Sequence, residues 1–204
     1  DQGRIIIPGF YDQVRTLSAQ ERKKLNDMPF DVELFKKTYG LDEIVTEPSY
    51  SPQETMWARP SYEVHGFFEG EKGNNIPTKA EAYVTMRLVA NQNPEKMFTF
   101  FRDFLMQKAE ELGVRKYLAI QEQGLAFPFS TTTEHPAFKA AEEAMEQAFG
   151  ASVDYMGIGG TEPIALFHQQ ILKVPVIFNA YNSPRDHYHG HDESFSIEKG
   201  FVPG

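Results

Sequence analysis

The chain of 204 residues contains no cysteine. This absence excludes disulfides, thiolate nucleophiles and thiolate metal sites, so any metal ion must be held by histidine and carboxylate side chains. The sequence also lacks an apolar run near the ~20 residues of a membrane-spanning helix, and its start has no signal-peptide pattern. We therefore expect a cytoplasmic protein that does not associate with membranes.

Positive charge is scarce as well. Twenty Lys and Arg against 29 Asp and Glu leave a formal net charge of -9 at pH 7. Without a cluster of basic residues, this balance disfavours nucleic acid as a partner. The chain has no initiator methionine, so we expect a fragment of a longer protein. Its 41% hydrophobic residues suffice for a buried core.

The first part of the chain predicts helices and an antiparallel sheet. Its pattern predicts helices after Ser18, over 30–39 and over 94–113, strands over 5–7, 62–68, 80–89 and 117–121, and a surface connection over 46–60. Over 80–89, Tyr83, Thr85 and Arg87 share the polar face of the strand. The order strand, strand, helix, strand is typical of an antiparallel sheet covered by helices on one face.

The second part has a different pattern, which predicts an α/β layer. A helix capped by Thr133 is expected to end at Phe149, and a glycine-rich segment over 157–163 leads into an apolar helix over 164–172. A buried strand is predicted over 174–180. Histidines follow this strand directly, and α/β folds place their sites at the carboxyl ends of strands.

Three of the six histidines fall at every second position, as His187, His189 and His191, between Asp186 and Glu193. Imidazole nitrogen suits zinc and similar cations, and neighbouring carboxylates can complete or orient such a site. The alternative is an exposed polar turn, because Gly190 and the nearby proline favour a loop. Both interpretations are open at this point.

Two further features could bind a ligand. The glycine run before the helix at 164 could receive an anion on its backbone N–H groups, or could be a tight structural turn. It is not a phosphate-binding loop, because no Lys-Ser/Thr follows and Glu162 would repel phosphate. Arg87 could clamp a carboxylate or form a surface ion pair.

The order of short motifs along nearly the whole chain resembles that of a known enzyme family. The segments are Ile7-Pro8-Gly9-Phe10-Tyr11-Asp12, Trp57-Ala58-Arg59-Pro60-Ser61, His65-Gly66, Asn75-Ile76-Pro77, Met86-Arg87-Leu88-Val89, Asn91-Gln92-Asn93-Pro94-Glu95, Gly159-Gly160-Thr161-Glu162-Pro163 and His189-Gly190-His191-Asp192-Glu193. In this order they resemble the zinc aminopeptidase-like metallohydrolases. The most similar branch is that of the carnosinase-like dipeptidases, alongside aminoacylases, succinyl-diaminopimelate desuccinylases and glutamate carboxypeptidases.

The resemblance implies an α/β fold with an α+β lid. Residues 1–124 would form a ferredoxin-like lid or dimerisation domain, incomplete at its N-terminus. Residues 125–204 would form the C-terminal part of an aminopeptidase-like α/β catalytic domain. Since such lids commonly mediate dimerisation, the resemblance also implies a homodimer.

The resemblance also implies functional residues. His189 matches the last metal ligand of the family, while Asn74 and Arg87 match lid positions that reach the substrate. Gly160 and Thr161 match the loop that cradles it. The implied cofactors are two zinc ions, with manganese or cobalt as alternatives, and the implied substrate is a small peptide or N-acyl amino acid. A metal-bridged water would lose its proton to a glutamate and attack the amide carbonyl.

Two departures from the family pattern set further expectations. Gly157 stands where dipeptidases usually have an arginine for the substrate carboxylate, and Glu162 stands at an Ile-like position. We hypothesise that this exchange weakens selection for a free C-terminal carboxylate and favours an amine-bearing substrate. The remaining metal ligands and the general base would precede residue 1, so no catalytic residue is assigned and the fragment alone is expected to be inactive.

Two other functions remain open. One is a non-catalytic dimerisation or binding module that keeps the lid fold. The other is a standalone metal-binding protein that uses His187, His189 and His191.

Overall fold

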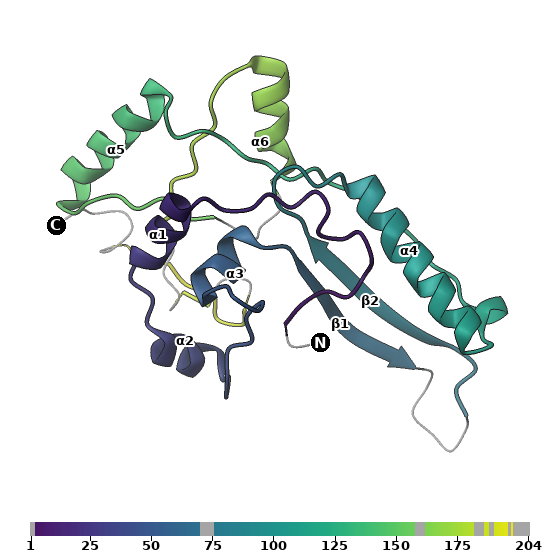
Figure 1. Cartoon of the computed structure of the whole chain (residues 1–204). Coiled ribbons are helices and arrows are strands. Elements are labelled where there is room, and N and C mark those ends of the chain that lie inside the picture. Colours follow the sequence, from purple (N-terminus) through teal and green to yellow (C-terminus); the bar gives the residue numbers. More distant parts are fainter. Residues whose placement is uncertain are drawn as a thin grey trace.

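A computed structural model describes residues 3–69, 76–157, 162–181, 186–187, 190–195 and 197 (Figure 1). The fold is a mixed α/β arrangement, as predicted from the sequence. Its sheet is an antiparallel hairpin of β1 (Ser61–Glu69) and β2 (Ala80–Arg87), and helix α4 (Pro94–Glu111) runs along it. Among the described residues, no helix is long and apolar enough to cross a membrane.

The pairing of the two strands fixes which side chains share a face. Ser61 pairs with Arg87 and Glu63 with Thr85, so these four residues lie on one face of the hairpin. The register shifts between Val64 and Gly66, which makes His65 the extra residue of a β-bulge. The strands predicted over 62–68 and 80–89 are thereby confirmed.

The other face of the hairpin forms the core together with α4 and the N-terminal segment. The buried members are Ile7, Phe10, Met97 and Phe101. Half-buried side chains that pack against them include Tyr62, Val84, Met86, Leu88, Phe104, Leu105 and Ile120. Asn93 caps α4 by accepting a hydrogen bond from the backbone N–H of Lys96, and Pro94 occupies the first turn. Apolar packing is thus confined to one face of the hairpin.

Three short helices, α1 (Ala19–Asp27), α2 (Val32–Tyr39) and α3 (Pro52–Ala58), lie beside the hairpin (Figure 1). The capping box predicted for α1 is present, with Ser18 and Glu21 bonding each other's backbone N–H groups. The prediction of a surface connection over 46–60 is wrong. That segment contains α3, because Ser51 and Glu54 form a second capping box and Pro52 is accommodated in the first helical turn.

The remaining helices are η1 (Arg115–Tyr117), α5 (Pro136–Phe149), α6 (Pro163–Phe167) and the π-helix η2 (His168–Leu172). Helices predicted over 134–149 and 164–172 are therefore confirmed in outline. The cap of α5 is not Thr133, however. His135 takes that position, and its Nδ1 accepts a hydrogen bond from the backbone N–H of Ala137 at 3.1 Å.

Three predicted strands, over 5–7, 117–121 and 174–180, do not form. Within the described ranges the sheet consists of β1 and β2, so these segments have no hydrogen-bonded neighbour strand. The backbone of Ile5 instead donates to the Tyr11 hydroxyl at 3.2 Å. An apolar pattern makes a segment suitable for a strand, but only a partner strand satisfies its backbone.

Candidate functional site

Arg87 is the last residue of β2 and lies on the exposed face of the hairpin. Because side chains alternate along a strand, Thr85 and Tyr83 share this face with it. The paired register places Ser61 opposite Arg87 and Glu63 opposite Thr85. The face predicted from the alternation of residues is therefore the face that points away from the core.

The side chain of His65 also lies on this face, which could not be predicted from the sequence. Its Nε2 lies 2.6 Å from the Thr85 hydroxyl, and its ring centroid lies 5.5 Å from that of Tyr83. His65 lies within the strand predicted over 62–68. The structure places it at the bulge inside β1, where its side chain reaches across to β2. A bulge leaves no clear mark in the alternation of residues.

Gly157, the first residue of the glycine-rich segment, lies against the backbone of Trp57. A Cβ atom at Gly157 would lie 2.1 Å from the Trp57 carbonyl oxygen. Trp57 belongs to α3, and its ring stacks edge-on against Phe30, with centroids 6.5 Å apart. Any side chain at position 157, an arginine included, would have to displace this backbone.

Glu162 occupies the N-cap position of α6, immediately before Pro163. Its side chain makes no capping hydrogen bond, and the residue is exposed to solvent. An accessible carboxylate at this point adds negative charge beside the glycine-rich segment.

The described residues of the histidine-rich segment, 186–187 and 190–193, belong to no helix or strand, which agrees with the interpretation based on Gly190. The backbone N–H of Gly190 donates to the His187 carbonyl at 2.6 Å, and that of Ser194 donates to the Asp186 carbonyl at 2.9 Å. Both His187 and His191 are exposed. Within the described part of the chain, no three His, Asp or Glu side chains are grouped to hold a metal ion. The described side chains of this segment therefore form no metal site among themselves.

Of the six predicted site residues, the structure describes two, Arg87 and Glu162, on β2 and at the start of α6. The other four lie outside the described residues. They are Asn74, Gly160, Thr161 and His189.

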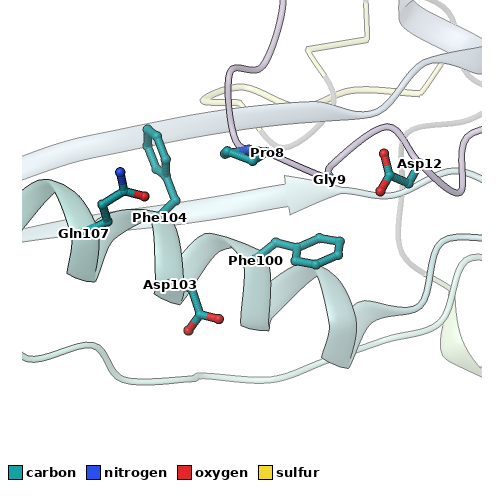
Figure 2. A pocket seen from close by; sticks show the side chains of 7 residues that line it. All are labelled: Pro8, Gly9, Asp12, Phe100, Asp103, Phe104 and Gln107. Atoms are coloured by element: carbon teal, nitrogen blue, oxygen red, sulfur yellow. The ribbon is translucent and has the colours of Figure 1, made fainter.

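An open cavity of about 310 Å³ lies between residues 8–12 and α4. Figure 2 shows Phe100, Asp103, Phe104 and Gln107 along α4, with Pro8, Gly9 and Asp12 on the facing segment. None of the six predicted site residues lines it. This cavity therefore does not mark the predicted site.

Comparison with known protein families shows to which family the chain belongs. Residues 32–204 match the family described as Peptidase family M20/M25/M40. The chain belongs to this family. The match includes the hairpin, the Trp57–Gly157 contact and the histidine-rich segment.

Curated relatives and a solved structure agree with this membership. The Cys-Gly metallodipeptidase dug1 of Schizosaccharomyces pombe is 24% identical over 99% of this chain and 43% of its own length. The Beta-Ala-His dipeptidase of Rattus norvegicus is 24% identical over 95% of this chain and 40% of its own length. The structure of the di-peptidase Dug1p from Saccharomyces cerevisiae is 21% identical, has a TM-score of 0.81, and is matched over 97% of this chain and 42% of that chain.

The chain thus has the fold of the corresponding part of these peptidases. It spans about two fifths of the length of the curated relatives that it matches.

Proposed function

We propose that this chain is the C-terminal portion of a metal-dependent hydrolase that cleaves dipeptides or related amides. Residues 1–124 would belong to the lid and residues 125–204 to the catalytic domain. The observation that carries the proposal is the family match over 32–204, together with relatives that are metallodipeptidases and more than twice as long as the matched segment. Segment 174–180 has no neighbour strand among the described residues. Its exposed apolar side chains, such as Phe178 at 52% exposure, fit a strand that further chain would cover.

The proposal assigns roles to particular residues. Arg87 and Asn74 contact the substrate from the lid, and Gly160 and Thr161 cradle it from the catalytic domain. His189 contributes one ligand to a centre of two divalent ions, with zinc expected and manganese or cobalt as alternatives. The bound metal would activate the attacking water. One histidine cannot fix two ions, so the other ligands must come from further chain.

Charge supports a substrate with an amine. The Trp57 carbonyl oxygen lies where a side chain of residue 157 would begin, so a cationic side chain at that position would have to displace this backbone. The exposed Glu162 carboxylate adds a negative charge nearby in the sequence. A site of this character favours an ammonium group over a free carboxylate. We further propose a homodimer formed through the lid and a cytoplasmic location, which the lack of cysteine favours.

The decisive experiment uses the full reading frame that contains this chain. Dipeptide hydrolysis is measured before and after metal removal by a chelator, and again after zinc, manganese or cobalt is added back. We expect activity that requires metal and is lost in His189→Ala. His191→Ala is the matched control, because His191 matches a variable position and should keep activity within about threefold, an effect of under 1 kcal/mol.

Three outcomes are informative. Metal-independent hydrolysis, or an unchanged rate in His189→Ala, would contradict the proposal. A dimeric full-length protein that binds no metal and hydrolyses no dipeptide would favour a non-catalytic dimerisation module. The 204-residue chain alone is expected to be inactive, and metal-dependent turnover by it would contradict the assignment of the missing ligands to further chain.

A further inference from the structure

The exposed face of the hairpin carries an ordered group of polar side chains next to Arg87. Tyr83 and Thr85 precede Arg87 at every second position of β2, and His65 contacts both of them from β1. The distances are 2.6 Å between His65 Nε2 and the Thr85 hydroxyl, and 5.5 Å between the ring centroids of His65 and Tyr83. We call His65, Tyr83, Thr85 and Arg87 the outer strip.

Packing of the core does not explain the outer strip. The core residues of the hairpin, Tyr62, Val84 and Met86, point to the opposite face and pack against α4. His65 is exposed, and Tyr83 keeps 47% of its surface accessible. A hydrogen bond at such an exposed position contributes little to the stability of the fold.

The bulge at His65 suggests that its orientation matters. It is the irregularity in a ladder that is otherwise continuous from Ser61 to Glu69. Bulges are over-represented at sheet edges and beside active sites, and they can redirect a side chain. Here the His65 side chain forms a hydrogen bond with the hydroxyl of Thr85, two positions before Arg87.

The spacing of the strip matches a small peptide. Strand residues two positions apart are separated by roughly 6.8 Å, which is also about the length of an extended dipeptide. A substrate carbonyl bound by the Arg87 guanidinium would therefore place its neighbouring residue beside Thr85 and Tyr83. The hydroxyl and the ring offer a hydrogen-bonding group and an apolar surface to that residue.

We propose that His65 is a positioning residue, which holds Thr85 and Tyr83 beside Arg87 so that the outer strip contacts a dipeptide substrate as one preformed surface. This inference rests on the proposed function, because it takes from it the contact between Arg87 and the substrate. A preformed surface lowers the entropy lost on binding, so the loss of His65 or of its hydrogen bond weakens binding of the substrate.

The test uses the full-length enzyme and steady-state kinetics with a dipeptide that it hydrolyses. Thr85→Val keeps the shape of the side chain and removes the hydroxyl that meets His65. We expect KM to rise about three- to tenfold in Thr85→Val and in His65→Leu with kcat within about twofold, because a lost neutral hydrogen bond acts on binding. Thr85→Ser keeps a hydroxyl at this position, so its KM should stay within about threefold of the wild-type value. This change is smaller than the one expected from the loss of a hydrogen bond.

The control is Thr99→Val, which removes a hydroxyl that donates to the Glu95 carbonyl within α4 at 2.9 Å. This variant should leave KM unchanged. If Arg87→Lys raises KM while Thr85→Val and His65→Leu do not, the role of His65 is overturned and the proposed function stands. A fall in the unfolding temperature of Thr85→Val without a change in KM also overturns it. If the wild-type enzyme hydrolyses no dipeptide, both proposals fail.

Discussion

Arg59 and Glu47 form a two-point ion pair that is almost completely shielded from solvent. Arg59 Nε lies 2.7 Å from Glu47 Oε2, and its terminal nitrogen lies 2.9 Å from Oε1. The side chains are 7% and 2% exposed. The guanidinium also lies between the rings of Tyr50 and Tyr11, with its carbon 4.3 and 5.2 Å from the two centroids. This pair ties the segment before α3 to the start of β1.

Breaking this pair should be costly. Arg59→Met would leave the Glu47 carboxylate buried, with Arg4 as a weaker partner 3.6 Å away. We expect a loss of about 3–5 kcal/mol in the free energy of unfolding, because the unpaired charge stays desolvated. The measurement is urea unfolding followed by circular dichroism.

Two variants make this prediction specific. Replacing both partners, as Glu47→Met with Arg59→Met, should recover most of the loss, since no buried charge remains. Lys108→Met breaks the exposed pair of Lys108 with Glu111 and should cost less than about 1 kcal/mol. Equal losses in Arg59→Met and Lys108→Met would show that burial of the pair has no energetic effect.

Gln92 is a second buried polar residue whose removal should destabilise the fold. It is 2% exposed, its Nε2 donates to the Phe10 carbonyl at 2.9 Å, and its Oε1 accepts from the backbone N–H of Val89 at 2.9 Å. Gln92→Leu would leave both backbone groups without this partner, at about 1–3 kcal/mol for each group. Thermal and urea unfolding measure the loss.

Gln107→Leu is the matched control for Gln92. Gln107 is exposed, and its side chain donates to Glu111 at 3.0 Å. Its replacement should change stability by less than about 0.5 kcal/mol. A similar small effect in Gln92→Leu would mean that the turn before α4 does not depend on this side chain.

The two capping-box glutamates predict a loss of stability in acid. A hydrogen bond from Arg15, aided by the backbone N–H of Ser18, lowers the pKa of Glu21 to about 2 from its usual 4.5. Hydrogen bonds from Arg22 likewise lower the pKa of Glu54. Groups with a depressed pKa in the folded state stabilise it above the unfolded pKa, and this contribution disappears as the pH falls through the folded pKa.

The expected loss therefore begins as the pH falls below about 4.5 and continues towards pH 2. Glu21→Gln combined with Glu54→Gln should be less stable than wild type at pH 7 and should lose less stability between pH 7 and pH 3. Because the Glu21 side chain is 40% exposed, solvent screens its ion pair. We therefore expect Glu21 to contribute less to this loss of stability than Glu54. Parallel pH profiles for wild type and the double variant would contradict the prediction.

Local signals explain the parts of the fold that could be predicted. Ser18 with Glu21 marks the start of α1, and Asn93 with Pro94 marks the start of α4, because each signal satisfies backbone groups within a few residues. Alternation along β2 predicted the correct face of Arg87, because side chains point to opposite faces at successive strand positions. Helix α3 was not predicted because the three prolines within 46–60 favour a surface connection, although Pro52 lies in the first turn of the helix.

Features that depend on distant partners could not be predicted. The segments 117–121 and 174–180 have strand-like composition, but strand formation requires a neighbour, and the described chain offers none to them. The same limit applies to the site. The bulge at His65 and the contact of Gly157 with Trp57 join residues far apart in the sequence, and neither is visible in a local pattern.

The contact between Gly157 and Trp57 gives the last prediction. A Cβ atom at position 157 would lie 2.1 Å from a backbone oxygen, which cannot move aside as a flexible side chain could. Gly157→Ala should therefore shift the segment away from α3 and cost about 1–3 kcal/mol, as overpacking does. Trp57 is the only tryptophan of the chain, so its fluorescence reports on this contact directly.

Gly124→Ala is the matched control, because a Cβ atom at Gly124 meets no atom within 4 Å. Neither glycine has the positive φ that would strain alanine, so the two substitutions differ in steric contact alone. We expect an altered Trp57 emission and a lower unfolding midpoint in Gly157→Ala, with both unchanged in Gly124→Ala. If the two variants have the same emission and midpoint, position 157 is free to carry a side chain. Steric contact with Trp57 would then not explain the absence of a cationic side chain at position 157.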